Sequence, residues 1–245
     1  MRGPQGQHYL FDGGSSDVEQ VGKYRIESFL KAQGVGTLDY VFISHGDLDH
    51  YSGIEEMIGR QLFGVNINTL IFPANYKQDE KLIKLASLAY ENGARVATID
   101  SGQKILEGDL EIRCIQPNGE NRAWEANANS MVLEVSFLEF AMLFTGDVEG
   151  EGEDILTRNV KGKAYDVLKV SHHGSKYSSS EKFLSSIQPR IALISSGENN
   201  FYGHPHVETL ERLKKYSCKI YQTQKQGAIT LETDGDLIDI FPSSI

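Results

Sequence analysis

The sequence predicts an α/β fold built from alternating strands and helices. Short apolar runs rich in β-branched and aromatic residues, such as residues 38–43 and 191–195, have the length and composition of buried strands. They alternate with longer stretches whose apolar residues recur at helical spacing, for example residues 79–92, which stop before Gly93. Strand-rich sequence follows this half, which is typical of a layered α/β architecture.

The expected elements follow one another along the chain. Strands are expected at 9–11, 38–43, 69–73, 95–98, 110–115, 131–136, 139–144, 165–171, 191–195, 228–232 and 237–241, the last two as a hairpin turning at Asp234-Gly235. Helices are expected at 18–33, 53–60, 79–92, 151–158, 178–187 and 205–216. The third helix should bury Leu82, Ile83, Ala86, Ala89 and Tyr90, and the sixth Val207, Leu210 and Leu213.

Length, charge and cysteine content limit the possible classes of protein. A chain of 245 residues is long enough for a substantial core, and we expect a single domain over residues 1–245. It contains no apolar run long enough to span a membrane. Its two cysteines, Cys114 and Cys218, do not make a disulfide scaffold. The net charge of −10 argues against a basic surface that binds nucleic acid.

Four potential metal ligands follow the strand at 38–43 within a few residues. They are His45, Asp47, Asp49 and His50. We expect them on an irregular loop, because neighbours on a strand point to opposite faces. The next helix is expected to start near Ser52, since Ser52 and Glu55 have the spacing of a capping box. Residues of these types are also common in solvated turns, so a loop without a metal is the alternative interpretation.

The same pattern of a strand followed by ligand-type residues returns twice. The strand at 139–144 leads into Thr145-Gly146-Asp147, and the strand at 165–171 leads into His172 and His173. Loops at the strand ends of an α/β sheet are where such a fold places its chemistry. Acidic and histidine residues that follow several strands in this way therefore indicate a metal site.

Taken together, the segments 44–53, 145–147 and 171–175 resemble the motifs of the metallo-β-lactamase superfamily. With an aspartate at position 47, this set of motifs resembles one branch of the superfamily. That branch is the soluble metallohydrolase domain of ComEC-type competence proteins, which take up DNA. The resemblance covers about residues 8–241 and implies a metallo-β-lactamase-like αββα four-layer sandwich. We expect its first N-terminal strand to be missing, so the chain is either a fragment or starts at an internal methionine of a longer product.

The resemblance also assigns roles to these residues. It implies that His45 and Asp47 hold a first metal, Asp49 and His50 hold a second, and Asp147 bridges both. It further implies that one of His172 and His173 completes the second site; we favour His173 as the ligand and His172 as a group that contacts a ligand or the substrate. Asp12, after the first strand, is either near the metals or a turn residue. The expected catalytic residues are Asp49, His172, Lys176 and His204.

Two of these assignments have open alternatives. Lys176 contacts either phosphate oxygens or only solvent, whereas His204, within Gly203-His204-Pro205-His206 at a helix start, is expected to contact the substrate or leaving group. His206 is expected to face solvent.

Most superfamily members place a third histidine on the first metal, but no histidine lies between His50 and His172. Asn129 or a water would have to take that position.

The implied cofactors are two divalent metal ions, Zn or Mn. Three aspartates with three histidines suit Mn²⁺ as well as Zn²⁺. The implied function is a phosphodiesterase or nuclease that hydrolyses DNA, single-stranded or at an exposed end, during competence-type uptake. The acidic net charge argues against DNA binding, but bound cations would neutralise the ligand aspartates and attract phosphates. The alternatives are a metal-dependent hydrolase of a small phosphodiester or other ester, and a non-catalytic domain that binds metal or DNA.

The location of the protein stays open at this point. The resemblance implies a soluble domain that is either the soluble part of a membrane-anchored protein or a cytoplasmic protein. Its implied partner, besides DNA, is the membrane-channel portion of a longer competence protein, which this chain does not include.

Overall fold

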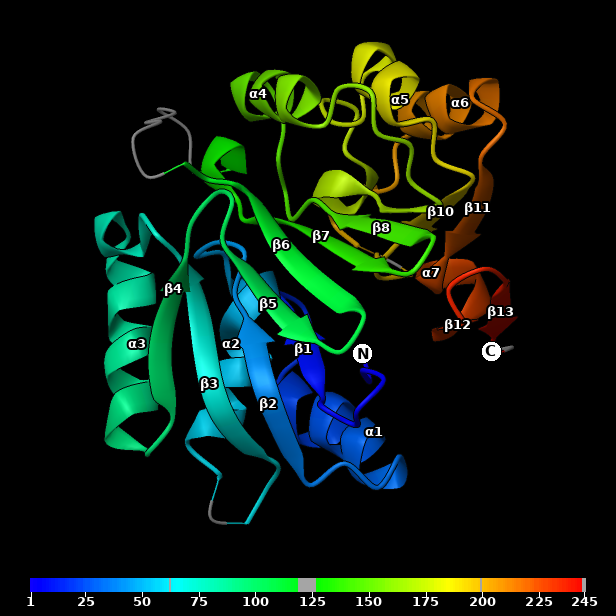
Figure 1. Ribbon diagram of the computed structural model, residues 1–245. Helices are drawn as coiled ribbons and strands as arrows, with labels where there is room; N and C mark the ends of the chain where they lie inside the picture. The colour runs from blue at the N-terminus through cyan, green and yellow to red at the C-terminus, as the bar shows by residue number, and fades with distance from the viewer. Residues whose placement is uncertain (62, 119–126, 199, 244–245) are drawn as a thin grey trace. The chain divides into compact units, whose positions relative to one another are not determined.

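The computed structural model describes residues 1–61, 63–118, 127–198 and 200–243 (Figure 1). The chain divides into two compact units, one of residues 1–103 and 117–120, the other of residues 104–116 and 121–245. Each unit has its own main sheet and its own hydrophobic core. The expectation of one domain over residues 1–245 stays a prediction.

The first unit is built on a sheet of four parallel strands in the order β1-β2-β3-β4. The strands are β1 (Tyr9–Phe11), β2 (Thr37–Phe42), β3 (Asn66–Pro73) and β4 (Arg95–Ile99). Parallel strands need crossover connections, and helical segments supply them. These are η1 (Gly22–Ile26), α1 (Glu27–Ala32), α2 (Leu48–Ile58), η2 (Tyr76–Gln78) and α3 (Glu80–Glu91). The carboxyl ends of β1 and β2 therefore lie side by side.

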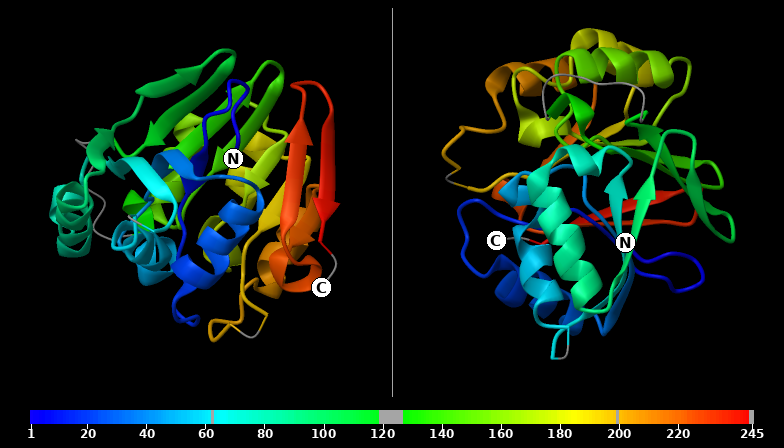
Figure 2. Two further views of the ribbon diagram at one scale, coloured as in Figure 1. Left: turned by 90° about the horizontal axis from the view of Figure 1, so that it is seen from below. Right: turned by 90° about the vertical axis from the view of Figure 1, so that its left-hand side faces the viewer.

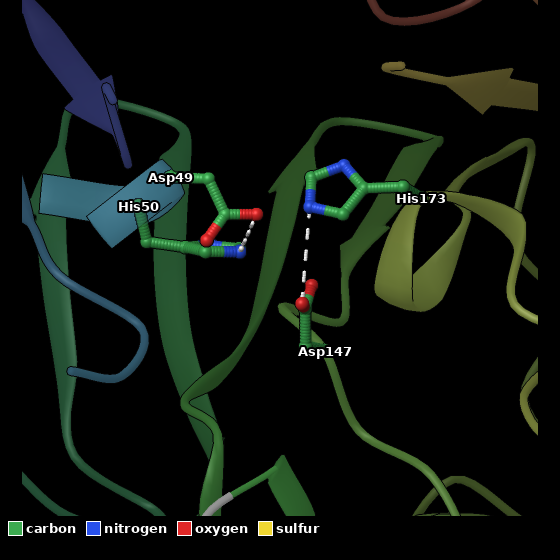
Figure 3. Close-up of side chains that lie close together, drawn as sticks. All are labelled: Asp49, His50, Asp147 and His173. Atoms are coloured by element: carbon green, nitrogen blue, oxygen red, sulfur yellow. Dashed lines mark ion pairs between the residues drawn. The ribbon is translucent and has the colours of Figure 1, made fainter. Parts of the chain in front are cut away.

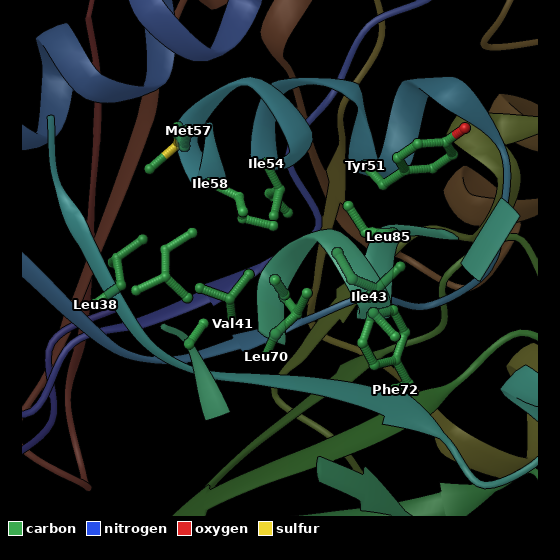
Figure 4. Close-up of a cluster of buried hydrophobic side chains, with 14 of the residues drawn as sticks. Leu38, Val41, Ile43, Tyr51, Ile54, Met57, Ile58, Leu70, Phe72 and Leu85 are labelled. Carbon is green, nitrogen blue, oxygen red and sulfur yellow. The ribbon is translucent and has the colours of Figure 1, made fainter. Parts of the chain in front are cut away.

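The core of the first unit fixes α2 against this sheet (Figure 4). Ile54, Met57 and Ile58 recur at helical spacing on one face of α2 and are completely buried. They pack in one cluster with Val41 of β2 and Leu70 of β3. Because burying each such side chain stabilises the fold by roughly 1.5–3 kcal/mol, the position of the first turn of α2 is set by this packing.

The second unit is built on a mixed sheet of seven strands in the order β11-β10-β9-β8-β7-β6-β5. The run from β5 to β8 is antiparallel, and the run from β8 to β11 is parallel. The strands are β5 (Lys104–Glu107), β6 (Leu110–Gln116), β7 (Val132–Phe137), β8 (Phe140–Phe144), β9 (Val167–Lys169), β10 (Ile191–Ile194) and β11 (Lys219–Gln222). Thus β8, β9 and β10, which precede the ligand-type residues of this unit, lie next to one another and run in the same direction.

Helices cover one face of this second sheet (Figure 1). They are α4 (Glu151–Asn159), α5 (Glu181–Ile187) and α6 (Val207–Lys215), and their apolar sides join one core cluster with β8, β9 and β10. The shorter segments are η3 (Asn127–Asn129), η4 (Ser171–Gly174) and α7 (Thr223–Gln226). The strands β12 (Ile229–Thr233) and β13 (Ile238–Pro242) pair as the expected hairpin (red in Figure 2).

The predicted strands and helices occur in the predicted order, but β5, β11 and α7 were not predicted, and several boundaries and faces were wrong. The helix expected from residue 53 begins at Leu48, so Asp49 and His50 lie in its first turn and not on an irregular loop. Ser52 does not cap it: its hydroxyl donates to Ser15 O at 3.1 Å and accepts from Ser15 N at 3.0 Å. Local capping residues predicted the wrong start, because packing of the helix against the sheet decides it.

Other expectations fail because of packing that periodicity does not reveal. The helix expected over 18–33 is a π-helical turn followed by α1. A side chain on Gly22 would come within 2.2 Å of Gly53 O, so this turn approaches α2 closely. Three residues that were expected to be buried are exposed, namely Ile83, Tyr90 and Val207.

At the N-terminus, Arg2 and His8 form an isolated antiparallel bridge, and the Met1 amino group donates to Tyr9 O at 2.6 Å. Cys114 and Cys218 are both free thiols and buried. Asn199, where the loop before the sixth helix was expected to begin, lies outside the described residues. Among the helices that the structure describes, none combines the length and apolar character that crossing a bilayer requires.

Replacement of Ile54 by alanine tests the role of the α2 core. Ile54 is completely buried, so Ile54→Ala should lower the free energy of unfolding by about 2–5 kcal/mol. Ile83→Ala is the matched control, because Ile83 is 40% exposed on α3; its effect should stay within roughly 0.5 kcal/mol. Urea denaturation followed by circular dichroism measures both, and equal losses would contradict the assignment of the core.

Candidate functional site

The carboxyl ends of β1 and β2 carry the ligand-type residues of the first unit. Asp12 N donates to Phe42 O at 2.9 Å, and Ser44 N donates to Asp12 Oδ1 at 2.7 Å, which holds the Asp12 side chain across the two strand ends. Asp12 Oδ2 lies 3.0 Å from His50 Nδ1. Of the two roles expected for Asp12, the structure therefore supports a contact with a ligand-type histidine rather than a turn residue alone.

The hydrogen bonds of these histidines orient their second nitrogen. An ionised carboxylate only accepts, so His50 donates its Nδ1–H to Asp12 and keeps a lone pair on Nε2. That Nε2 lies 3.8 Å from Asp49 Oδ2 (Figure 3). His45 is likewise contacted at Nδ1, which lies 3.0 Å from Ser44 Oγ, and its Nε2 lies 3.5 Å from Asp47 Oδ2. Histidines that ligate a metal are held by their other nitrogen in this way.

Asp12 and Asp47 are charged at neutral pH. Burial of Asp12 would raise its pKa, but the neighbouring His50 and the Ser44 N–H outweigh that effect and lower the pKa below its usual value. The neighbouring His45, with a further contribution from Lys81, lowers the pKa of Asp47 to about 2 against the opposing effect of burial. Lys81 Nζ lies 3.3 Å from Asp47 Oδ1. These anions suit a bound cation.

Gly46, in the middle of this ligand segment, leaves room for the start of α3. A Cβ atom at position 46 would come within 2.0 Å of the Asp79 carboxylate. Asp79 caps α3 by accepting a hydrogen bond from Lys81 N at 2.8 Å. The α3 N-terminus and the ligand segment therefore pack too closely for any residue larger than glycine.

In the second unit, Asp147 follows the end of β8. It is 3% exposed, and its backbone N–H donates to Ser130 Oγ at 3.3 Å. Two histidines approach its carboxylate: the Nε2 atoms of His172 and His173 lie 3.7 and 3.8 Å from Asp147 Oδ2 (Figure 3 draws the His173 pair). Both histidines therefore approach the same carboxylate, and which of them is a metal ligand stays a prediction.

The reason is the backbone of the histidine doublet. Strand β9 ends at Lys169, and His172 and His173 lie in η4 with φ of 47° and 53°. Left-handed backbone is uncommon for residues other than glycine and is often found at functional sites. This turn directs both rings towards the same carboxylate.

Both rings of the doublet are also held at Nδ1. His173 Nδ1 lies 2.7 Å from the carbonyl oxygen of Ser195, which only accepts, so His173 donates there and keeps its lone pair on Nε2. His172 Nδ1 lies 2.9 Å from Glu149 Oε2. That hydrogen bond lowers the pKa of Glu149 in spite of its partial burial. The sequence prediction missed both partners, although Glu149 stands only two residues after Asp147.

The segment after the doublet is tied to α6. Arg212 donates to the carbonyl oxygens of Ser179, Lys176 and Ser178 at 3.0, 2.9 and 2.9 Å. Thr209 Oγ1 donates to Ser175 O at 2.8 Å. These bonds satisfy carbonyl groups that no strand or helix pairs, and so they hold the segment that directly follows the two histidines.

The remaining predicted residues differ in their surroundings. His204 is buried with its ring centroid 5.3 Å from that of His172, and burial, together with the nearby histidines, lowers its pKa to about 4. Lys176 is exposed, with its ammonium 5.2 Å from the Tyr177 ring centroid. His206 was expected to face solvent but is half-buried, and its Nδ1 accepts from Lys176 N at 3.1 Å. Asn129, the possible substitute ligand, lies in η3.

Each unit thus brings together its own share of the predicted residues. The first unit groups His45, Asp47, Asp49 and His50, and the ring centroids of its two histidines are 4.1 Å apart. The second unit groups Asp147, His172, His173 and His204. Imidazole nitrogens with carboxylate oxygens are a donor set that zinc and manganese accept.

Replacement of Arg212 by methionine tests the support of the histidine doublet. The change keeps much of the side-chain volume but leaves three carbonyl groups without their donor, so the free energy of unfolding should fall by roughly 1–3 kcal/mol. Lys214→Met, at an exposed position of the same helix, should change it by less than about 0.5 kcal/mol. Thermal and urea unfolding measure both variants; equal stability of Arg212→Met and the parent would refute the supporting role.

Comparison with protein families gives a match over residues 2–111 to a family model described as the metallo-beta-lactamase superfamily. The chain is 32% identical over 201 residues to ComE operon protein 3 of Bacillus subtilis, covering 82% of this chain and 25% of that protein. It is 31% identical over 224 residues to Competence protein ComA of Neisseria gonorrhoeae, covering 91% of this chain and 29% of that protein. The chain therefore spans about a quarter of the length of these relatives.

Comparison with solved structures gives the fold. The metallo-beta-lactamase fold protein YhfI from Bacillus subtilis superposes with a TM-score of 0.55 at 11% sequence identity. The match covers 98% of this chain and 95% of YhfI. At this identity the likeness concerns the fold alone.

Proposed function

This chain belongs to the metallo-β-lactamase superfamily and has its α/β fold, as predicted, and we propose that it is a two-metal phosphodiesterase that cleaves DNA. One observation carries this proposal. His45 and His50 in the first unit, and His172 and His173 in the second, are contacted at Nδ1 and turn Nε2 towards an aspartate. Nitrogens arranged in this way are suited to metal ligation.

The proposed ligands come from both units. Asp49, His50, Asp147 and His173 have side chains of the types that ligate a metal ion, and we propose that they share one. We assign Asp49, His50 and His173 to one ion, His45 and Asp47 to another, and Asp147 to both. The set is rich in carboxylate oxygen and lacks a thiolate, so manganese suits it as well as zinc.

The chemistry follows from these assignments. Divalent ions held by these residues would lower the pKa of water towards neutrality and would stabilise the charge that grows on phosphate oxygens. Asp49 would accept the proton of the attacking water. His204 is neutral at physiological pH and would give a hydrogen bond to the leaving oxygen, while His172 and Lys176 would contact the phosphate.

The substrate and setting are inferred from the relatives. The relative from Neisseria gonorrhoeae is named a competence protein, and this chain matches 29% of its length. We therefore propose DNA, single-stranded or at an exposed end, as substrate during competence-type uptake. The proposed partner is the membrane-channel part of a longer protein. In that protein, this chain would be the domain outside the bilayer.

Plasmid nicking with Mn²⁺ tests the proposed activity. The parent chain should convert supercoiled plasmid to the open form, and Asp47→Ala and Asp147→Ala should each reduce the rate at least about 100-fold by removing a metal ligand. Asp154→Ala, at an exposed aspartate of α4, is the matched control and should keep the parent rate.

Two further measurements, turnover of a small phosphodiester and metal uptake, separate the competing functions. The acidic net charge of −10 favours a small substrate over DNA. Turnover of bis-p-nitrophenyl phosphate without plasmid cleavage would replace DNA by a small phosphodiester. Metal uptake without any turnover would indicate a binding domain and contradict the enzymatic proposal.

Replacement of Asp12 tests the metal centre without touching a proposed ligand. Asp12→Asn removes the charge that accepts from His50, and asparagine tolerates the left-handed backbone found here, with φ of 56°. Metal affinity should fall about 10–100-fold. Competition of the protein with a chelating dye for Zn²⁺ measures it, and Asp17→Asn, at an exposed position, should bind like the parent. An unchanged affinity in Asp12→Asn would exclude this role.

A further inference from the structure

A series of aromatic rings in the second unit runs from solvent to the histidine doublet. Phe201 is 93% exposed and Tyr202 64% exposed, and their ring centroids are 6.2 Å apart. Tyr202 stacks on His204 at 5.8 Å with 21° between the planes. The His204 ring lies 5.3 Å from that of His172 and 6.3 Å from that of His173. The exposed pair, Phe201 and Tyr202, is thus connected by ring contacts to the candidate catalytic residues.

The loop that carries the exposed pair is held by the side chain of Asn200. Its Nδ2 donates to Gly197 O at 2.9 Å and to His204 O at 2.6 Å, and its Oδ1 accepts from His204 N at 2.8 Å. Gly203 N donates to Asn200 O at 3.2 Å. The two rings are therefore presented by an ordered turn, so a ligand would not have to order them on binding.

Folding does not account for these two rings. An aromatic side chain stabilises a fold by leaving water, and the rings of the exposed pair remain in it. Single exposed apolar residues need no explanation, whereas two adjacent rings beside ligand-type histidines are the kind of surface that binds a partner. A third exposed ring, Tyr177, follows the doublet together with Lys176, and Lys176 N donates to His206 Nδ1, which joins this segment to the one after the exposed pair.

We propose that Phe201 and Tyr202 form a stacking surface for a nucleobase of single-stranded DNA, next to the phosphate that is cleaved. This inference rests on the proposed function and names the part of the substrate that the site recognises. Aromatic rings stack on any nucleobase, so such a surface tolerates all sequences. Bases within a duplex already stack on one another and cannot reach it, which makes the surface selective for single strands.

The charge of the protein supports stacking as a means of binding. With a net charge of −10, the chain cannot rely on long-range attraction of the phosphate backbone. Stacking depends little on net charge, and Lys176 adds one local cation in the segment after the doublet. Binding through Phe201 and Tyr202 therefore removes the main objection to a DNA substrate.

The test compares an oligonucleotide that has bases with one that lacks them. Fluorescence anisotropy of the full chain in EDTA, where no cleavage occurs, measures Kd for labelled dT12 and for an abasic strand of the same length. Phe201→Ala and Tyr202→Ala should raise Kd for dT12 about 5- to 150-fold and leave Kd for the abasic strand unchanged. Phe201→Tyr retains a ring and should bind dT12 within about threefold of the parent.

A matched control and a kinetic readout exclude a general effect of losing an exposed ring. Phe63→Ala removes an 86% exposed phenylalanine of the other unit and should bind both strands like the parent. With Mn²⁺, Phe201→Ala should raise KM for dT12 and leave kcat within about twofold, because stacking binds substrate and transition state alike.

Two results would overturn the stacking surface. One is parent-like binding of dT12 by both alanine variants; the other is an equal loss of affinity for dT12 and the abasic strand. Failure of the proposed function looks different. In that case the metal-loaded chain cleaves no phosphodiester, while the preference for strands with bases and its loss in Phe201→Ala remain.

Discussion

The candidate site depends on one restraint, an oxygen beside Nδ1 of each histidine. An imidazole that can rotate or exchange its proton presents a lone pair at Nε2 only part of the time, whereas one held at Nδ1 presents it continuously. In His50 and His173 the group beside Nδ1 is a carboxylate or a carbonyl, which can only accept, so Nδ1 carries the proton. The oxygens come from Asp12, Ser44, Glu149 and Ser195.

The rest of each unit keeps these oxygens and rings in place. In the first unit, parallel pairing of β1 with β2 brings Asp12 beside the ligand segment, and the buried face of α2 fixes its first turn. In the second unit, the parallel strands β8, β9 and β10 end beside one another and supply Asp147, the histidine doublet and the Ser195 carbonyl. Arg212 then holds the segment that directly follows the doublet.

Residue types and strand ends could be predicted from the sequence, whereas side-chain geometry could not. His45, Asp147 and the doublet directly follow apolar runs, so local pattern was sufficient to place them. The left-handed turn at His172 and His173 has no signal in the local sequence, and the segment after it is held by hydrogen bonds from α6, which lies more than thirty residues further along the chain. The start of α2 depends on burial rather than on capping, and Ser195 contributes only a backbone atom, which no residue type can reveal.

The tautomers of the histidines test the central claim most directly. Two-dimensional ¹H–¹⁵N NMR of the imidazole rings, without metal and during addition of Zn²⁺, identifies which nitrogen carries the proton and which one binds. The account predicts Nδ1–H tautomers for His50 and His173, with the Zn²⁺-induced change at Nε2. Protons on Nε2 in these two rings, or a Zn²⁺-induced change at Nδ1, would contradict it.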